Sequence, residues 1–190
     1  ILIDPKRTCF AVFDSVPKQV KIVEKINPST SLKAIKNKVE VENNRHTFVK
    51  DGIALTRFFK WLEENVSSGE LSELSIADKL RGFRESQDGF VDVSFTTIAG
   101  YLDHGALPHY SANEKSNYTL EPKGLLLVDS GGQYTTGTTD ITRVVTLGGL
   151  TQEEKEDYTL VLKGTIEGSQ AIFPTGTRGY QIDAITRRPL

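Results

Sequence analysis

Two aspartates occur at a spacing that could bring their carboxylates together. Asp129 directly follows the apolar run 125–128, and Asp140 follows a turn rich in glycine and threonine at 131–139. If the flanking segments pair as an antiparallel hairpin, the two aspartates lie roughly opposite each other with Cβ atoms about 5 Å apart. Like charges at that distance repel unless a cation lies between them. The pattern therefore predicts that one or two divalent metal ions bind between Asp129 and Asp140.

The same two aspartates can also be interpreted as turn residues. Asp129 could accept hydrogen bonds from the backbone of residues 130–132, and Asp140 could be an ordinary charge at the edge of a strand. Aspartate side chains often accept hydrogen bonds from the backbone of a turn, particularly next to glycine and threonine. The spacing by itself leaves both interpretations open.

Two histidines, His104 and His109, lie in the segment 103–112 that leads towards the hairpin. A neutral imidazole can bind a metal ion or stabilise a developing oxyanion, and a loop histidine can equally be a polar surface residue. His109 is the candidate for a functional role. His104 stands between Asp103 and Gly105 and is expected to be a turn residue.

Helix caps and apolar spacing indicate the elements that must position these side chains. Asn37 with Glu40, and Thr151 with Glu154, have the capping-box pattern at the starts of two helices. The expected elements are strands within 8–14 and 19–26, a loop at 27–31, helices over 37–66 and 72–84, strand segments within 90–101, the hairpin, and helices starting near 151 and 179.

The helices over 37–66 and 72–84 should each bury an apolar face, because apolar residues recur in them near helical spacing. The residues expected to point inwards are Phe48, Leu55, Phe59, Leu62 and Val66 on the first helix, and Leu74, Ala77, Leu80 and Phe83 on the second.

Composition limits the classes of protein that fit. The chain has 190 residues, 37% of them hydrophobic and 25% charged, with a formal net charge of −2. No block of one charge sign suggests a nucleic acid or membrane partner, so a small molecule or peptide fits better. The single cysteine, Cys9, excludes an internal disulfide, and residues 1–20 lack a signal-peptide pattern. We expect a cytoplasmic protein and, because position 1 is not Met, a fragment.

Several motifs together resemble the aminopeptidase P group of the pita-bread metallopeptidases, which include prolidase, methionine aminopeptidase and creatinase. The matching segments are IKNKVEVENNR, VKDGIAL, LSIADKLRGFR, ALPHYSA, LLLVDSGGQYTTGTTDITR and FPTGTRG. The resemblance covers nearly all of residues 32–190. Its most specific element is the Asp-x₁₀-Asp spacing, with Thr139, Thr142 and Arg143 around the second aspartate.

The resemblance implies an α+β fold in which helices cover a curved antiparallel sheet, with two divalent metal ions, commonly manganese, at its centre. Two aspartates, one histidine and two glutamates hold the metals in this family. Asp129 and Asp140 match the two aspartates, with Asp140 bridging. His109 matches the histidine that contacts substrate or stabilises the tetrahedral intermediate. The implied substrates are short peptides with proline at the second position.

The sequence departs from the family pattern after Asp140, because no histidine follows it and the later acidic residues lie in helix-like stretches. Residues 32–190 are therefore expected to be the first part of a pita-bread catalytic domain, inactive alone. Residues 1–31 would be the tail of a preceding creatinase-type N-terminal domain plus a linker. An incomplete sheet would leave an open edge, so association into homodimers is a further expectation.

Two other functions remain open. The chain could belong to a relative that uses the pita-bread fold as a binding module, as certain histone-chaperone subunits do. It could also belong to a metal-free relative of the creatinase type. Retention of Asp129, Asp140 and His109 argues against the binding module, and the Asp pair argues against the metal-free enzyme.

Overall fold

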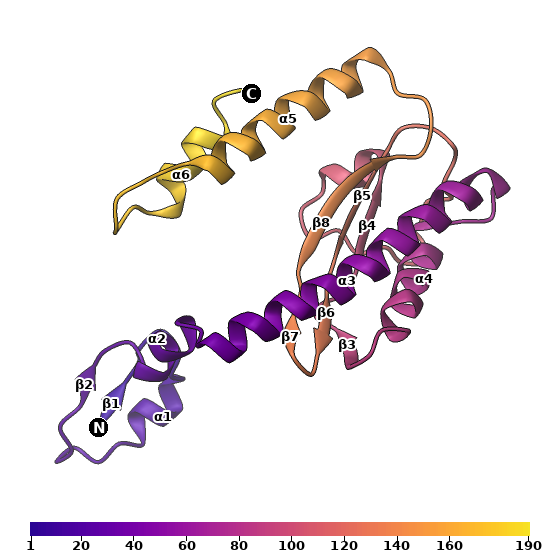
Figure 1. Ribbon diagram of the computed structural model, residues 1–190. Helices are drawn as coiled ribbons and strands as arrows, with labels where there is room; N and C mark the ends of the chain where they lie inside the picture. Colours follow the sequence, from indigo (N-terminus) through magenta and orange to yellow (C-terminus); the bar gives the residue numbers. More distant parts are fainter. The chain divides into compact units, whose positions relative to one another are not determined.

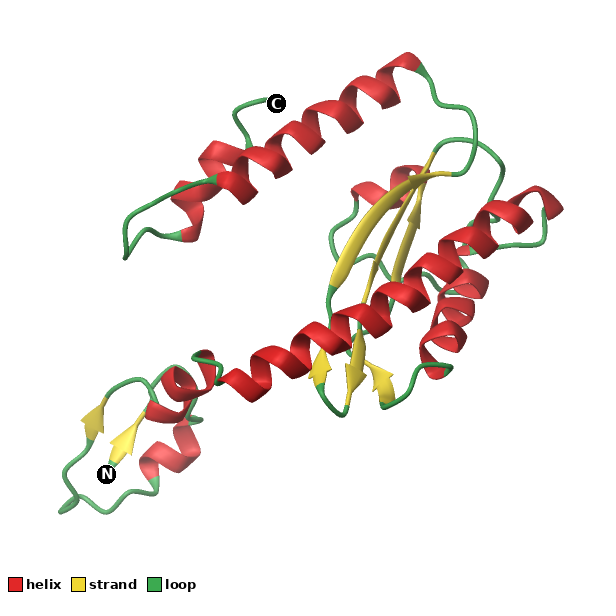
Figure 2. Cartoon of the chain, in the orientation of Figure 1, coloured by secondary structure: helices red, strands yellow, loops and turns green.

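A computed structural model describes all of residues 1–190, which form helices and three short sheets (Figures 1 and 2). The chain divides into two compact units, residues 1–46 and 47–190. No helix combines the length and the apolar character needed to cross a membrane.

The first unit contains a small parallel pair of strands, β1 (Leu2–Ile3) and β2 (Val23–Glu24), and two short helices, α1 (Phe10–Asp14) and α2 (Pro28–Ala34). The prediction of a strand within 8–14 is wrong, because residues 10–14 form α1. Their apolar run has no alternation, so its pattern does not distinguish a strand from a helix. The expected loop at 27–31 is also wrong, because Asn27 caps α2 by accepting from the Ser29 N–H.

The long helix α3 (Lys38–Asn65) starts at the expected capping box. The Glu40 N–H donates to Asn37 Oδ1 at 3.0 Å, and the Asn37 N–H donates to Glu40 Oε2 at 2.8 Å. The expected inward position of Phe48 is wrong, because its side chain is 47% exposed. The buried face of α3 instead consists of Thr47, Asp51, Ala54, Leu55, Phe58 and Leu62.

Helix α4 (Glu73–Glu85) begins at the N-cap Ser72 and buries a stripe that includes charged residues. Glu73, Ile76, Leu80 and Arg84 are its buried residues, whereas Leu74, Ala77 and Phe83 are only half-buried. The buried face of α4 is therefore rotated by about one residue from the face that we expected. The apolar pattern missed it because Glu73 and Arg84 are buried through polar partners.

Residues 47–190 contain two antiparallel sheets of three strands. The larger sheet has the order β4 (Ile98–Tyr101), β5 (Leu125–Ser130) and β8 (Ile141–Thr146). The smaller has the order β3 (Phe90–Val93), β6 (Gly132–Tyr134) and β7 (Gly137–Thr138). The expected antiparallel pairing of β5 with β8 is confirmed, but the segment between them forms the β6–β7 hairpin, which pairs with β3.

The hydrophobic core lies between one face of the larger sheet and the helices α3 and α4 (Figure 1). Strand β5 alternates strictly, with Leu126 and Val128 buried on this face. They pack with Phe58 of α3 and Leu80 of α4. Asp129, next in the alternation, therefore lies on the opposite face of the sheet.

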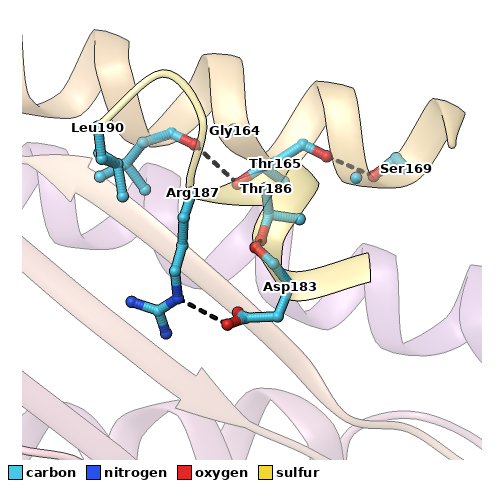
Figure 3. Close-up of a pocket in the computed structure, with 9 residues that line it drawn as sticks. Gly164, Thr165, Ser169, Asp183, Thr186, Arg187 and Leu190 are labelled. Carbon is cyan, nitrogen blue, oxygen red and sulfur yellow. Dashed lines mark hydrogen bonds and ion pairs between the residues drawn. The ribbon is translucent and has the colours of Figure 1, made fainter. Parts of the chain in front are cut away.

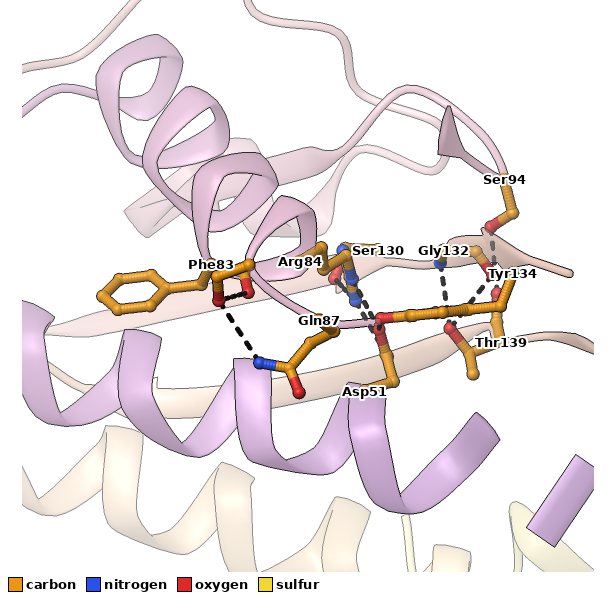
Figure 4. Close-up of polar contacts among 10 residues, drawn as sticks. Asp51, Phe83, Arg84, Gln87, Ser94, Ser130, Gly132, Tyr134 and Thr139 are labelled. Atoms are coloured by element: carbon orange, nitrogen blue, oxygen red, sulfur yellow. Dashed lines mark hydrogen bonds and ion pairs between the residues drawn. The ribbon is translucent and has the colours of Figure 1, made fainter. Parts of the chain in front are cut away.

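A buried ion pair connects four elements next to this core (Figure 4). Arg84 Nε on α4 donates to Asp51 Oδ1 on α3 at 2.7 Å, and both side chains are fully buried. Arg84 Nη2 also donates to Ser130 Oγ at the end of β5, at 3.1 Å. The Tyr134 hydroxyl on β6 donates to Asp51 Oδ1 at 2.9 Å. These contacts fix both sheets to the helices.

The chain ends with helices α5 (Gln152–Gln170) and α6 (Gly179–Thr186), which pack against each other. The expected capping box of Thr151 and Glu154 is confirmed at the start of α5. Gly164 and Gly168 face α6, where a Cβ atom would overlap with Thr186. The two glycines therefore allow the helices to approach closely. The remaining elements are two short 3₁₀ helices, η1 (Val66–Ser68) and η2 (Leu102–Ala106).

Candidate metal centre

Asp129 is held at the end of β5 by the neighbouring strand. It is half-buried and lies directly opposite Thr142 of β8. The Thr142 hydroxyl donates a hydrogen bond to Asp129 Oδ1 at 2.8 Å. This bond orients the carboxylate on the face of the sheet that α3 and α4 leave free.

The expected register, with Asp129 opposite Asp140, is wrong. The last pair of the ladder is Ser130 with Ile141, and the exposed Asp140 comes just before β8. The extra residues of the β6–β7 hairpin move Asp140 beyond the paired region. Asp140 thus lies two residues before the position opposite Asp129, which Thr142 occupies.

His109 and Asp129 line the same cleft, which has a volume of about 280 Å³. Thr142 lines it too, as do residues 104–108 of the preceding loop, whereas Asp140 does not. His109 is exposed and has a φ of 56°, a left-handed backbone conformation that is uncommon for residues other than glycine. The structure thus brings two of the three candidate residues together in one cleft.

His104 lies in a tight turn as expected, the 3₁₀ helix η2, but its side chain is buried. Its Nδ1 lies 2.9 Å from Oε1 of the buried Glu73. Its ring stacks on Tyr118 and Tyr110, with centroid distances of 3.7 and 4.3 Å. Sequence reasoning missed Glu73 altogether. Its only signal was its place in the first turn of a helix, where an acidic residue is ordinarily explained by the helix dipole.

Asp129 and His109, which line the cleft, are residue types that can bind a divalent metal ion, but they make up only part of a metal site. Carboxylate oxygens are suitable ligands for manganese and similar divalent cations. Among residues 1–190, no three His, Cys, Asp or Glu side chains lie close enough together to hold a metal ion. A two-metal centre built on Asp129 and Asp140 would therefore need ligands in addition to those that these residues provide.

A second cleft, with a volume of about 520 Å³, lies elsewhere, between α5 and α6 (Figure 3). Two of the residues that line it form an ion pair, Arg187 Nε with Asp183 Oδ2 at 2.7 Å, and both side chains are more than half exposed. None of the candidate residues lines it.

An antiparallel sheet with helices on one face and a carboxylate cleft on the other is the first part of the pita-bread fold of metallopeptidases. The model of metallopeptidase family M24 matches residues 42–190. The chain belongs to this family, which confirms the resemblance drawn from the motifs.

Relatives with curated names support a narrower group within the family. A probable Xaa-Pro aminopeptidase P of Laccaria bicolor is 43% identical over 97% of this chain and 29% of its own length. The Xaa-Pro aminopeptidase ApepP of Drosophila melanogaster is 40% identical over 92% of this chain and 28% of its own length. The chain thus spans less than a third of these relatives.

Solved structures confirm the fold. The X-prolyl aminopeptidase of Caenorhabditis elegans, described as a cytosolic enzyme with a di-nuclear active site, has a TM-score of 0.82 and 38% identity, over 88% of this chain and 28% of that one. The X-Pro aminopeptidase of Thermotoga maritima has a TM-score of 0.75 at 23% identity, over 99% of this chain and 51% of that one. At this lower identity, the likeness supports the fold alone.

Proposed function

We propose that this chain is part of a metal-dependent Xaa-Pro aminopeptidase, which releases the N-terminal residue from peptides with proline at the second position. The observation that carries the proposal is the cleft in which His109 lies with Asp129, on the free face of a pita-bread sheet. The names of the relatives support the substrate class. The description of the nematode enzyme as cytosolic supports a cytoplasmic location.

In this proposal Asp129 and Asp140 are ligands of a centre of two divalent metal ions, for which we propose manganese. Such a centre supplies a hydroxide nucleophile at neutral pH and polarises the scissile carbonyl. Thr142 holds the Asp129 carboxylate in one orientation through its hydroxyl. His109 lines the same cleft as Asp129, where its imidazole can donate to the oxyanion that develops on the substrate.

We further propose that residues 32–190 are the first part of the catalytic domain, and that residues 1–31 belong to a preceding domain and linker. The chain spans only 29% and 28% of two relatives, which supports its being one part of a larger enzyme. The remaining metal ligands would then come from other parts of the whole enzyme, meaning the aminopeptidase that contains this chain. Residues 1–190 alone should be inactive.

The function can be tested in two preparations. The whole enzyme should cleave an Xaa-Pro peptide in the presence of Mn²⁺, and it should leave a matched peptide with alanine at the second position largely intact. Asp129→Asn and Asp140→Asn should each abolish cleavage and reduce bound manganese. Failure of the whole enzyme to cleave the proline peptide would contradict the proposal.

The 190-residue chain, tested separately with Mn²⁺ and the same peptide, should neither cleave it nor bind two metal ions stoichiometrically. Each divalent cation needs several ligands, and two carboxylates are too few to replace the bound water of two cations. Stoichiometric binding with cleavage would show that all the metal ligands lie within residues 1–190.

A further inference from the structure

Glu73, the first residue of α4, is a fully buried carboxylate with an unusually complete set of donors. Oε1 accepts from the Tyr101 N–H at 2.9 Å and lies 2.9 Å from His104 Nδ1. Oε2 accepts from the Tyr110 hydroxyl at 2.9 Å and from the Tyr118 N–H at 3.0 Å. A buried carboxylate is costly unless such partners compensate for the lost water.

All four partners of Glu73 belong to the loop that carries His109 or to its ends. Tyr101 is the last residue of β4, and Tyr118 is the last residue of the loop 102–118 that follows it. His104 and Tyr110 lie within the loop, and Tyr110 directly follows His109 in the chain. A single carboxylate on α4 thus holds both ends and the middle of the segment 101–118.

Two further contacts restrict this loop. The His104 ring is sandwiched between the rings of Tyr110 and Tyr118. Gly105 packs against β4 so closely that a Cβ atom on Gly100 would lie 2.9 Å from the Gly105 Cα. A backbone conformation such as that of His109 (φ 56°) costs free energy and persists only where the surroundings hold it.

We propose that Glu73 is a positioning residue, which acts through His104 and Tyr110 to hold the loop 102–118 so that His109 faces Asp129 in the cleft. The inference rests on the proposed function, because positioning His109 affects catalysis only if His109 acts on the substrate. The competing explanation is that Glu73 only contributes to the stability of the fold.

A double-mutant cycle in the whole enzyme distinguishes the two explanations. Glu73→Gln keeps the shape of the side chain but replaces one acceptor oxygen with a donor group. It should lower kcat by about tenfold or more with KM little changed, as loss of an orienting partner does at other sites. In the His109→Ala background, the same substitution should change kcat by no more than about twofold, because the group that it positions is absent. An equal loss of kcat in both backgrounds would overturn the proposal.

Tyr110→Phe provides a milder second variant in case Glu73→Gln folds poorly. It removes one hydrogen bond to Glu73 and should show the same coupling to His109→Ala. Tyr134→Phe is the matched control, because the Tyr134 hydroxyl also donates at 2.9 Å to a buried carboxylate, that of Asp51. Its effect on kcat should be additive with that of His109→Ala. If Tyr134→Phe couples to His109→Ala as strongly as Tyr110→Phe does, the double-mutant cycle measures general destabilisation and not positioning of His109.

Hydrogen–deuterium exchange of the 190-residue chain tests the positioning without any activity. Glu73→Gln and Tyr110→Phe should both speed exchange within residues 102–118, whereas Tyr134→Phe should not. Unchanged exchange in this loop in both variants would overturn the positioning proposal even if the enzyme is an aminopeptidase. If loop exchange changes but His109→Ala leaves kcat intact, the proposed role of His109 fails and the structural role of Glu73 remains.

Discussion

Thr142 and Asp129 lie directly opposite each other on β8 and β5, and the threonine hydroxyl donates to Asp129 Oδ1 at 2.8 Å. The bond crosses the strand pair on the face that the core helices do not cover. The bond orients the carboxylate and does not involve Oδ2, the atom that would be available to the proposed metal ion. Outer partners of this kind keep a metal ligand in the orientation that binding requires.

Thr142→Val in the whole enzyme should weaken manganese binding by about tenfold or more, because the shape of the side chain is kept and the hydroxyl is lost. Titration of the metal-free enzyme with Mn²⁺ measures the change. Thr138→Val is the matched control, since the Thr138 hydroxyl donates to the amide oxygen of Gln133 rather than to a candidate ligand. Equal affinities of wild type and Thr142→Val would show that the hydroxyl has no role at the metal centre.

His109→Ala should lower kcat of the whole enzyme by about 100-fold, which corresponds to about 3 kcal/mol for one oxyanion donor. Bound manganese should stay unchanged, because His109 is proposed to contact substrate and not metal. Elemental analysis beside steady-state kinetics checks both quantities. His46→Ala, at an exposed histidine on α3, serves as the control and should change neither. Parallel losses of metal and activity would identify His109 as a ligand instead.

Arg84→Met should lower the free energy of unfolding of the chain by about 3–5 kcal/mol, because it leaves the Asp51 charge buried without its cation. Arg81→Met is the matched control on the same helix. Arg81 pairs with Glu85 at 2.8 Å and with Asp92 at 2.9 Å, but these three side chains are 44%, 54% and 59% exposed. Loss of Arg81 should therefore lower the free energy of unfolding far less than loss of Arg84. Urea denaturation of both variants measures the difference, and similar losses would contradict the importance of the buried pair.

The stability of the chain should fall at alkaline pH partly because of Tyr134. Burial raises the pKa of its hydroxyl well above the ordinary value, and the hydrogen bond to Asp51 raises it further. A tyrosine in the unfolded chain has a pKa of about 10, whereas the folded Tyr134 keeps its proton above that pH. Above that pH the unfolded state binds fewer protons, so the free energy of unfolding decreases as pH rises. Below it, the contribution is fully present.

The urea midpoint of Tyr134→Phe should therefore decline less steeply than that of wild type between about pH 9 and about pH 11. Lysine and the other tyrosines titrate in both proteins, so the difference between the two slopes isolates Tyr134. Identical slopes would mean that Tyr134 ionises equally easily in the folded and unfolded chain.

Features fixed by local interactions were predictable from the sequence. The capping boxes at Asn37 and Thr151 need only residues three positions away, and both form as expected. The pairing of β5 with β8 followed from two apolar runs around a turn. Its register did not, because the residues between them form strands that pair with β3, far away in the chain. That long-range pairing displaced Asp140 from the position opposite Asp129.

Buried polar residues were the least predictable part. Glu73 resembles an ordinary acidic residue at a helix start, and Arg84 resembles a solvent-facing cation. Each is buried only because its partners come from segments that lie 28 to 46 residues further along or 33 residues earlier in the chain. Apolar periodicity carries no information about such partners, which explains why the buried face of α4 was misplaced.

The close contact between α5 and α6 has a consequence for how this sequence can vary. A side chain at Gly164 would overlap with the backbone carbonyl oxygen of Thr186, which no change of rotamer can move away. Gly168 faces Thr186 Cγ2 instead, a side-chain atom that a change of rotamer can move. A larger residue at Gly164 is therefore tolerated only if α6 shifts as a whole, through a change in the connection 171–178. In natural variants of this chain, replacement of Gly164 and insertion or deletion in that connection should occur together.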